Sequence, residues 1–143
     1  MNSMLVDTNV WVDIVLKRPA FFEASMGAVM ACVEEGMRIV VVGTSVKDVF
    51  YWVERSAGAA AGYRSLGMLF DIAEVAAVDD LVCKRALSLE KPDYEDGIVA
   101  ACAQAEQVDA VLSRDASAFN ELGIPKFEPR ELLVHLGYED TVF

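Results

Sequence analysis

The sequence has no long uninterrupted apolar run, and none approaches the roughly 20 residues that a membrane-spanning helix needs. Its opening, Met1–Asp7, lacks both a basic segment and a long apolar core of the kind that secretory signals carry. We therefore expect a cytoplasmic protein that makes no use of a membrane. With 143 residues, 55% of them hydrophobic, the chain predicts one compact domain over residues 1–143.

Cysteine and histidine are also scarce. The three cysteines, Cys32, Cys83 and Cys102, are odd in number, far apart and set in apolar patterns without a C-x-x-C pair. They are interpreted as small core residues rather than as metal ligands or a disulfide framework. The single histidine, His135, lies far in the sequence from the acidic motifs described below.

Basic residues are few as well: 12 lysines and arginines stand against 23 acidic residues, for a formal net charge of −11. Nucleic-acid-binding proteins usually carry a basic footprint, so this charge argues against avid nonspecific binding to nucleic acid. It is compatible with a carboxylate-lined metal site or with a basic partner.

Short apolar segments alternate with helical patterns along the chain, and the segments lack the polar alternation of half-exposed strands. This predicts an α/β fold, a three-layer α/β/α sandwich with a central, mainly parallel sheet of four or five strands. The expected strands are 4–6, 38–42, 73–78, 110–113 and an edge strand at 126–127. The expected helices are 8–18, 21–35, one capped by Ser45, 63–71, one capped by Asp79, one capped by Asp93, 116–122 and 130–136, with a small-residue break at 57–61.

The helix predicted to begin at Asp93 carries two acids above an alanine-rich face. Pro92 disfavours helix at the residue before it, so Asp93 can act as N-cap with Asp96 in the first turn. Ala100 and Ala103 share the face of Asp96, where a solvated helix would carry long charged side chains. We therefore expect another element to pack closely against this face, with the acids directed into a cleft.

Other acids are expected at the same end of the sheet. Asp7 and Asp115 follow apolar strands, and Asp48 is predicted at the third position of the helix after the second strand. Ligands of open α/β sheets bind beyond the carboxyl ends of the strands. Several carboxylates there would repel one another without a cation, and oxygen ligands without histidine or cysteine suit Mg²⁺ or Mn²⁺. Such a site is suited to hydrolysis of phosphodiester bonds.

Four segments resemble the signatures of PIN domains, in order and over nearly the whole chain: Leu5–Val10, Thr44–Asp48, Asp93–Ala103 and Leu112–Asp115 with Phe119. The resemblance implies a Mg²⁺- or Mn²⁺-dependent endoribonuclease acting on RNA, often the toxin of a VapC-type toxin–antitoxin pair and commonly a homodimer. It also implies that an antitoxin would occlude the acidic cleft with an arginine-bearing or hydrophobic tail.

The resemblance further assigns residues. Asp7, Asp48, Asp96 and Asp115 correspond to the catalytic acidic quartet, and Asp7, Asp96 and Asp115 are the expected metal ligands. Asp93 corresponds to an accessory acid, and Asn9 to a polar residue that orients a ligand.

Several alternatives stay open at this point. Asp93, Asp96 and Asp48 could each serve only to cap a helix. Arg114, beside Asp115, is the first candidate for contacting the scissile phosphate, although a solvated surface charge is the simpler interpretation. Weaker candidates for contacts with the RNA backbone are Lys17, Arg18, Lys47 and Arg55. The aromatic residues Trp11, Tyr51 and Trp52 are expected in the core or in an interface rather than stacked on bases.

Two other functions compete with a ribonuclease. A non-catalytic PIN-like binding module would agree with the acidic charge. A phosphatase of the haloacid dehalogenase kind also places an aspartate after the first strand. That family has a second aspartate two residues later, where this sequence has Asn9.

Overall fold

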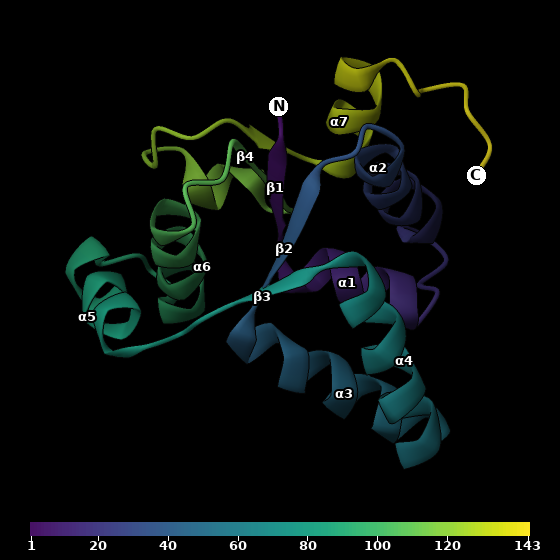
Figure 1. The fold of residues 1–143 in the computed structure, drawn as a ribbon, viewed down its shortest axis with the longest axis horizontal. Helices are drawn as coiled ribbons and strands as arrows, with labels where there is room; N and C mark the ends of the chain where they lie inside the picture. The colour runs from purple at the N-terminus through teal and green to yellow at the C-terminus, as the bar shows by residue number, and fades with distance from the viewer.

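A computed structural model describes residues 1–143 and shows helices on both sides of a twisted sheet (Figure 1). The strands are β1 Ser3–Val6, β2 Arg38–Val42, β3 Glu74–Ala76, β4 Ala110–Leu112 and β5 Lys126–Phe127. The helices are α1 Thr8–Val15, α2 Phe22–Glu34, α3 Gly43–Ala57, α4 Ala59–Ile72, α5 Asp80–Leu89, α6 Tyr94–Ala105, α7 Pro129–Leu136 and the 3₁₀ helix η1 Ala116–Phe119.

The five strands form one sheet in the order β3-β2-β1-β4-β5, and every neighbouring pair is parallel. Met4 pairs with Ile39 on one side and with Ala110 on the other, which places β1 at the centre. Strands covered on both faces are usually apolar throughout, and β1 and β2 are apolar after their first residues, Ser3 and Arg38. The predicted three-layer α/β/α fold with a parallel sheet is confirmed.

Alternate residues of the central strands enter two separate cores. Met4 and Val6 of β1 pack with α1, α2 and α7, whereas Leu5 packs with α5 and α6 on the other face. Figure 1 shows α5 and α6 on one side of the strands, α1, α2 and α7 on the other, and α3 with α4 below them. Because all strands are parallel, their carboxyl ends share one edge, and the loops that carry the acids leave from that edge.

Four predicted helix boundaries are wrong. α1, expected over 8–18, ends at Val15. α3 begins at Gly43, directly after β2, so Ser45 is not its cap and Asp48 lies in the second turn rather than at the third position. The expected break at 57–61 is a single residue, Gly58, whose φ of 89° reverses the chain without a loop. The expected helix at 116–122 is the four-residue η1.

The cysteine prediction holds in part. Cys32 and Cys102 are buried and Cys83 is only half-buried, and all three are free thiols. Burial raises the pKa of Cys32 to about 12 and that of Cys102 to about 11, as expected for inert core thiols. None of the helices is both long enough and apolar enough to cross a membrane.

Gly97 sets how closely α6 approaches α5. A Cβ at this position would lie 3.0 Å from the carbonyl oxygen of Ala86, a backbone atom that cannot rotate away. Gly97→Ala should therefore force α5 and α6 apart and lower the free energy of unfolding by about 1–2 kcal/mol, despite the better helix propensity of alanine. Urea denaturation would measure the change.

Gly67 offers a matched control, because it also lies inside a helix but nothing lies within 4 Å of its added Cβ. Gly67→Ala should stabilise the protein by roughly 0.5–1 kcal/mol. A stabilising effect of both substitutions would contradict the close approach of α5 and α6.

Candidate active site

An open cavity of about 550 Å³ lies at the carboxyl edge of the sheet and is lined mostly by polar side chains. Its lining consists of Asp7, Thr8, Asn9, Val12, Arg18, Asp48, Tyr51, Trp52, Asp93, Glu95, Asp96 and Asp115. All four acids of the predicted quartet are present, together with both predicted accessory residues. The other six lining residues are Thr8, Val12, Arg18, Tyr51, Trp52 and Glu95, of which Glu95 is an acid to which the sequence assigned no role.

Asp7 is the most enclosed of these acids, with 6% of its surface exposed. Its Oδ1 accepts a hydrogen bond from the Thr8 amide at 2.8 Å, and its Oδ2 accepts one from Ser113 Oγ at 2.8 Å. Desolvation nevertheless raises the pKa of the Asp7 carboxyl, and the nearby charges of Asp115 and Asp93 raise it further. The folded protein thus holds a buried carboxylate whose charge its own hydrogen bonds do not fully compensate.

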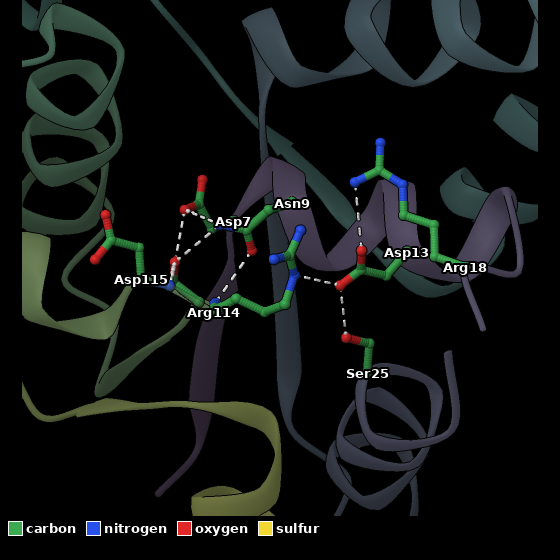
Figure 2. A network of polar contacts seen from close by, with 8 residues as sticks. Asp7, Asn9, Asp13, Arg18, Ser25, Arg114 and Asp115 are labelled. Atoms are coloured by element: carbon green, nitrogen blue, oxygen red, sulfur yellow. Dashed lines mark hydrogen bonds and ion pairs between the residues drawn. The ribbon is translucent and has the colours of Figure 1, made fainter. Parts of the chain in front are cut away.

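Ser113 connects Asp7 to Asp115 across the first and fourth strands. Its hydroxyl donates to Asp7 and accepts a hydrogen bond of 3.0 Å from the Asp115 amide. Asn9 completes the arrangement: its Nδ2 lies 3.3 Å from both Asp7 Oδ2 and Ser113 Oγ, and its Oδ1 accepts from the Arg114 amide at 3.1 Å. These bonds fix the orientation of Asp7 before any ligand binds (Figure 2).

Helix α6 brings further acids to the cavity. Asp93 is its N-cap and accepts a hydrogen bond of 2.9 Å from the Glu95 amide, as predicted. The pKa of Asp96 is raised to about 6, first by desolvation and then by the charges of Asp7, Asp93, Asp115 and Glu95. The two acids therefore differ: Asp93 has a capping role, whereas Asp96 is in an unfavourable electrostatic environment that capping does not explain.

The alanine face of α6 is buried, as predicted. Ala100 and Ala103 have no exposed surface and pack in the same core as Leu5 and Val111 of the sheet. Small side chains allow the helix axis to approach the strands, and this places Asp96 beside the strand ends.

Asp48 reaches the cavity from the opposite wall, on α3. It forms an exposed ion pair with its neighbour Lys47, with Oδ1 and Nζ 2.9 Å apart. Its charge also contributes to the raised pKa of Glu95, after desolvation. Ser45, one turn earlier, makes a hydroxyl–hydroxyl hydrogen bond of 2.5 Å with Thr8, which joins α3 to the start of α1.

The structure does not bring Arg114 to these acids. Its Nε donates a hydrogen bond of 2.7 Å to Asp13 Oδ2, and its guanidinium lies 4.0 Å from the centre of the Phe21 ring. Asp13 is completely buried and also pairs with Arg18, at 3.6 Å (Figure 2). Asp13 was not singled out from the sequence, although a lone acid within the apolar run Val10–Val15 is a signal that a buried polar partner is needed.

The donor set is chemically suited to a hard divalent cation. Asp7, Asp96 and Asp115 offer carboxylate oxygens, which Mg²⁺ and Mn²⁺ prefer. The pKa values of Asp7 and Asp96 are raised mainly by desolvation and further by neighbouring acids. As the side chains stand, no group of three or more acidic, histidine or cysteine residues is arranged to hold a metal ion. Metal binding by these residues stays a prediction.

Comparison with solved structures finds the same fold in toxin–antitoxin proteins. VapBC2 from Rickettsia felis, solved with a promoter DNA fragment, matches with a TM-score of 0.68 at 13% identity over 87% of this chain and 97% of that one. A toxin–antitoxin complex from Klebsiella pneumoniae matches with a TM-score of 0.68 at 19% identity, over 90% and 99%. VapC20 from Mycobacterium tuberculosis, described as a sarcin–ricin-loop-cleaving toxin, matches with a TM-score of 0.62 at 13% identity, over 76% and 87%.

At these identities the likeness establishes the fold and not the activity. No curated protein matches the sequence significantly. The family model described as PIN domain matches residues 3–117, which include β1 through β4 and all the acids of the cavity. The chain therefore belongs to the PIN domain family.

Proposed function

We propose that this protein is an endoribonuclease that hydrolyses RNA phosphodiester bonds with Mg²⁺ or Mn²⁺. The observation that carries the proposal is the group of acids around one open cavity, Asp7, Asp48, Asp93, Glu95, Asp96 and Asp115. The pKa values of three of them, Asp7, Glu95 and Asp96, are raised, first by desolvation and then by the charges of neighbouring acids. A protein gains no stability from such a cluster, so a bound cation is its simplest explanation.

The position of each acid in the cavity suggests its role. Asp7, Asp96 and Asp115 would hold the cation, and Asp48 would act from the facing wall. When bound, a divalent cation supplies charge neutralisation for the phosphate and lowers the pKa of water. Asn9 and Ser113 keep Asp7 in one orientation through the hydrogen bonds described above, so that the carboxylate is preorganised for its ligand.

We further propose that the protein is the toxin of a toxin–antitoxin pair and acts in the cytoplasm. Support comes from the PIN domain match and from structural neighbours described as VapBC and toxin–antitoxin complexes. The expected partners are RNA as substrate, a cognate antitoxin and a second copy of the chain. The net charge of −11 suits an antitoxin tail that carries arginine.

RNA cleavage tests the central proposal. Purified protein should cleave labelled RNA when Mg²⁺ or Mn²⁺ is added, and chelation of the metal should stop cleavage. Asp7→Asn protein prepared in the same way controls for contaminating nucleases and should be inactive. Equal cleavage by both proteins would reject the proposal, and calorimetry that detects no binding of either ion at millimolar concentration would favour the non-catalytic alternative.

A further inference from the structure

We propose that Tyr51 and Trp52 form a stacking platform for an unpaired nucleobase beside the scissile phosphate, and that Arg18 contacts the RNA backbone there. This inference rests on the proposed nuclease function, because it concerns the same cavity, but its test does not depend on cleavage.

The two aromatic rings are placed where a substrate would pass. Asp48, Tyr51, Trp52 and Arg55 follow the i, i+3, i+4, i+7 spacing of one face of α3, and the first three line the acidic cavity. Tyr51 is 49% exposed and Trp52 is 42% exposed, with ring centres 5.4 Å apart and planes at 74°. Of the two places expected for these aromatics, the core and an interface, their exposure excludes the core.

Arg55 holds the tyrosine side of this platform in place. Its Nη1 donates a hydrogen bond of 2.7 Å to the Tyr51 hydroxyl, and its guanidinium lies 5.5 Å from the centre of the same ring. A restrained ring loses less side-chain freedom when a base stacks on it. Arg55 also adds a positive charge at the far end of the aromatic face.

Charge explains why a base, and not only the backbone, must be recognised. Arg18 is the only basic residue among the side chains that line the cavity, against six acids, and the whole chain carries a net charge of −11. Affinity for nucleic acid usually comes from several phosphate contacts, which this cavity cannot provide. Stacking on aromatic rings is independent of phosphate charge, and it requires bases that are not already stacked within a duplex.

Arg18 is better placed than Arg114 to meet a phosphate. Both arginines pair with Asp13, but Arg114 does so through a 2.7 Å hydrogen bond, whereas Arg18 lies 3.6 Å away and its side chain is 37% exposed. Figure 2 shows the two guanidinium groups approaching Asp13 separately. The looser partner can turn toward a ligand while the tighter one keeps the buried carboxylate paired.

Tryptophan fluorescence can detect the platform directly. The chain has two tryptophans, and Trp11 is only 3% exposed with its Nε1 donating to the Val6 carbonyl, so quenching by a ligand in the cavity reports on Trp52. The probe is a nuclease-resistant 2′-O-methyl RNA of about twelve nucleotides, titrated with Mg²⁺ present, either alone or annealed to its complement. We expect the single strand to quench and the duplex to quench much less.

Variants separate stacking from general effects on the fold. Trp52→Ala and Tyr51→Ala should each weaken binding of the single strand about tenfold, measured by anisotropy of a labelled probe, and Trp52→Phe should recover most of the affinity. Phe70→Ala is the matched control, because Phe70 is also 49% exposed but lies on α4 outside the cavity, and binding should not change. Arg18→Gln should weaken binding and reduce its dependence on salt.

The outcomes distinguish this inference from the nuclease proposal. If RNA is cleaved but the probe neither quenches Trp52 nor binds more weakly to the alanine variants, the platform is wrong and the nuclease stands. If the probe binds as expected but no RNA is cleaved, the platform stands and the nuclease is wrong. Equal quenching by duplex and single strand would show that Trp52 does not stack on an unpaired base and would overturn the platform, and equal loss of binding in Phe70→Ala would overturn the assignment to this face.

Discussion

Asp96→Asn should reduce RNA cleavage about a thousandfold and at the same time make the metal-free protein more stable. The loss of activity follows if Asp96 is a ligand of the catalytic cation. The gain in stability follows from the electrostatics already in place, since asparagine keeps the shape of the side chain and removes one of several mutually repelling charges. An ordinary structural residue would not combine these two effects.

The sign of the stability effect depends on pH. The pKa of Asp96 is about 6 in the folded protein, against 3.8 for the free side chain, so the folded state binds more protons than the unfolded state between those values. Stability then falls as pH rises through this range, and the metal-free protein should be more stable near pH 5 than near pH 7. Because Asp96 is partly exposed, solvent screening limits its share to about 1 kcal/mol.

Thermal unfolding of the metal-free protein at several pH values would measure this. The Asp96→Asn variant should have a higher melting temperature than the parent at pH 7 and a flatter dependence on pH. Adding Mg²⁺ should stabilise the parent more than the variant, since a ligand that binds only the folded state raises its stability. A variant that melts at a lower temperature than the parent at pH 7 would contradict the electrostatic interpretation.

Asp109 is a control for which the dependence of stability on pH should have the opposite sign to that of Asp96. It lies outside the cavity, and hydrogen bonds from the backbone amides of Asn2 and Ser3 lower the pKa of its carboxyl. Its contribution to stability is present at neutral pH and lost as pH falls through its folded pKa. Asp109→Asn should therefore destabilise the protein at pH 7 and leave cleavage unchanged.

The sequence was sufficient to predict the layers and the end of the sheet at which the acids gather. Apolar strands and helix signals are local, and parallel connectivity then places Asp7 and Asp115 at one edge without further information. Pro92 and Asp93 likewise predicted the start of α6 correctly, because proline and a capping acid act through the backbone of their own turn.

The features of the site that could not be predicted from the sequence depend on residues that contact one another only in the folded chain. Ser113 gave no signal, since a serine after a strand has many uses, and its link between Asp7 and Asp115 depends on the pairing of β1 with β4. The exposure of Tyr51 and Trp52 depends on which face of α3 the rest of the fold covers, and the spacing of residues within the helix does not determine this. Arg114 follows the strand that leads to Asp115, yet a buried acid on α1 draws its side chain away.

That buried acid, Asp13, should be the most sensitive single position for stability. Its Oδ2 accepts hydrogen bonds from Arg114 Nε at 2.7 Å and from Ser25 Oγ at 3.1 Å, while Oδ1 has only the longer ion pair with Arg18. Asp13→Ala would leave Arg114 without its counterion in a partly buried site and open a gap at a fully buried position. We expect a loss of about 3–5 kcal/mol in the free energy of unfolding, measured by urea denaturation.

A second substitution separates loss of the charge pair from loss of packing. Once Asp13 is replaced by leucine, Arg114→Met should recover part of the lost stability, because two apolar side chains cost less there than one unpaired charge. The exposed pair of Lys84 and Asp80, at 2.8 Å, is the matched control, and Asp80→Ala should cost no more than about 1 kcal/mol. Similar costs for Asp13→Ala and Asp80→Ala would show that the buried network contributes little.

Asp13→Ala should also disturb the cavity, through the backbone of Arg114. Arg114 donates its amide hydrogen to Asn9, and Asn9 in turn contacts both Asp7 and Ser113, so a displaced Arg114 would loosen the orientation of Asp7. Second-layer changes of this kind typically cost about 10–100-fold in metal affinity or activity. Asp13→Asn, which keeps the shape of the side chain and an oxygen that can accept from Arg114, should retain more activity than Asp13→Ala at a temperature where both variants are folded. Equal activity in the two variants would mean that Asp13 supports the fold without positioning Asp7.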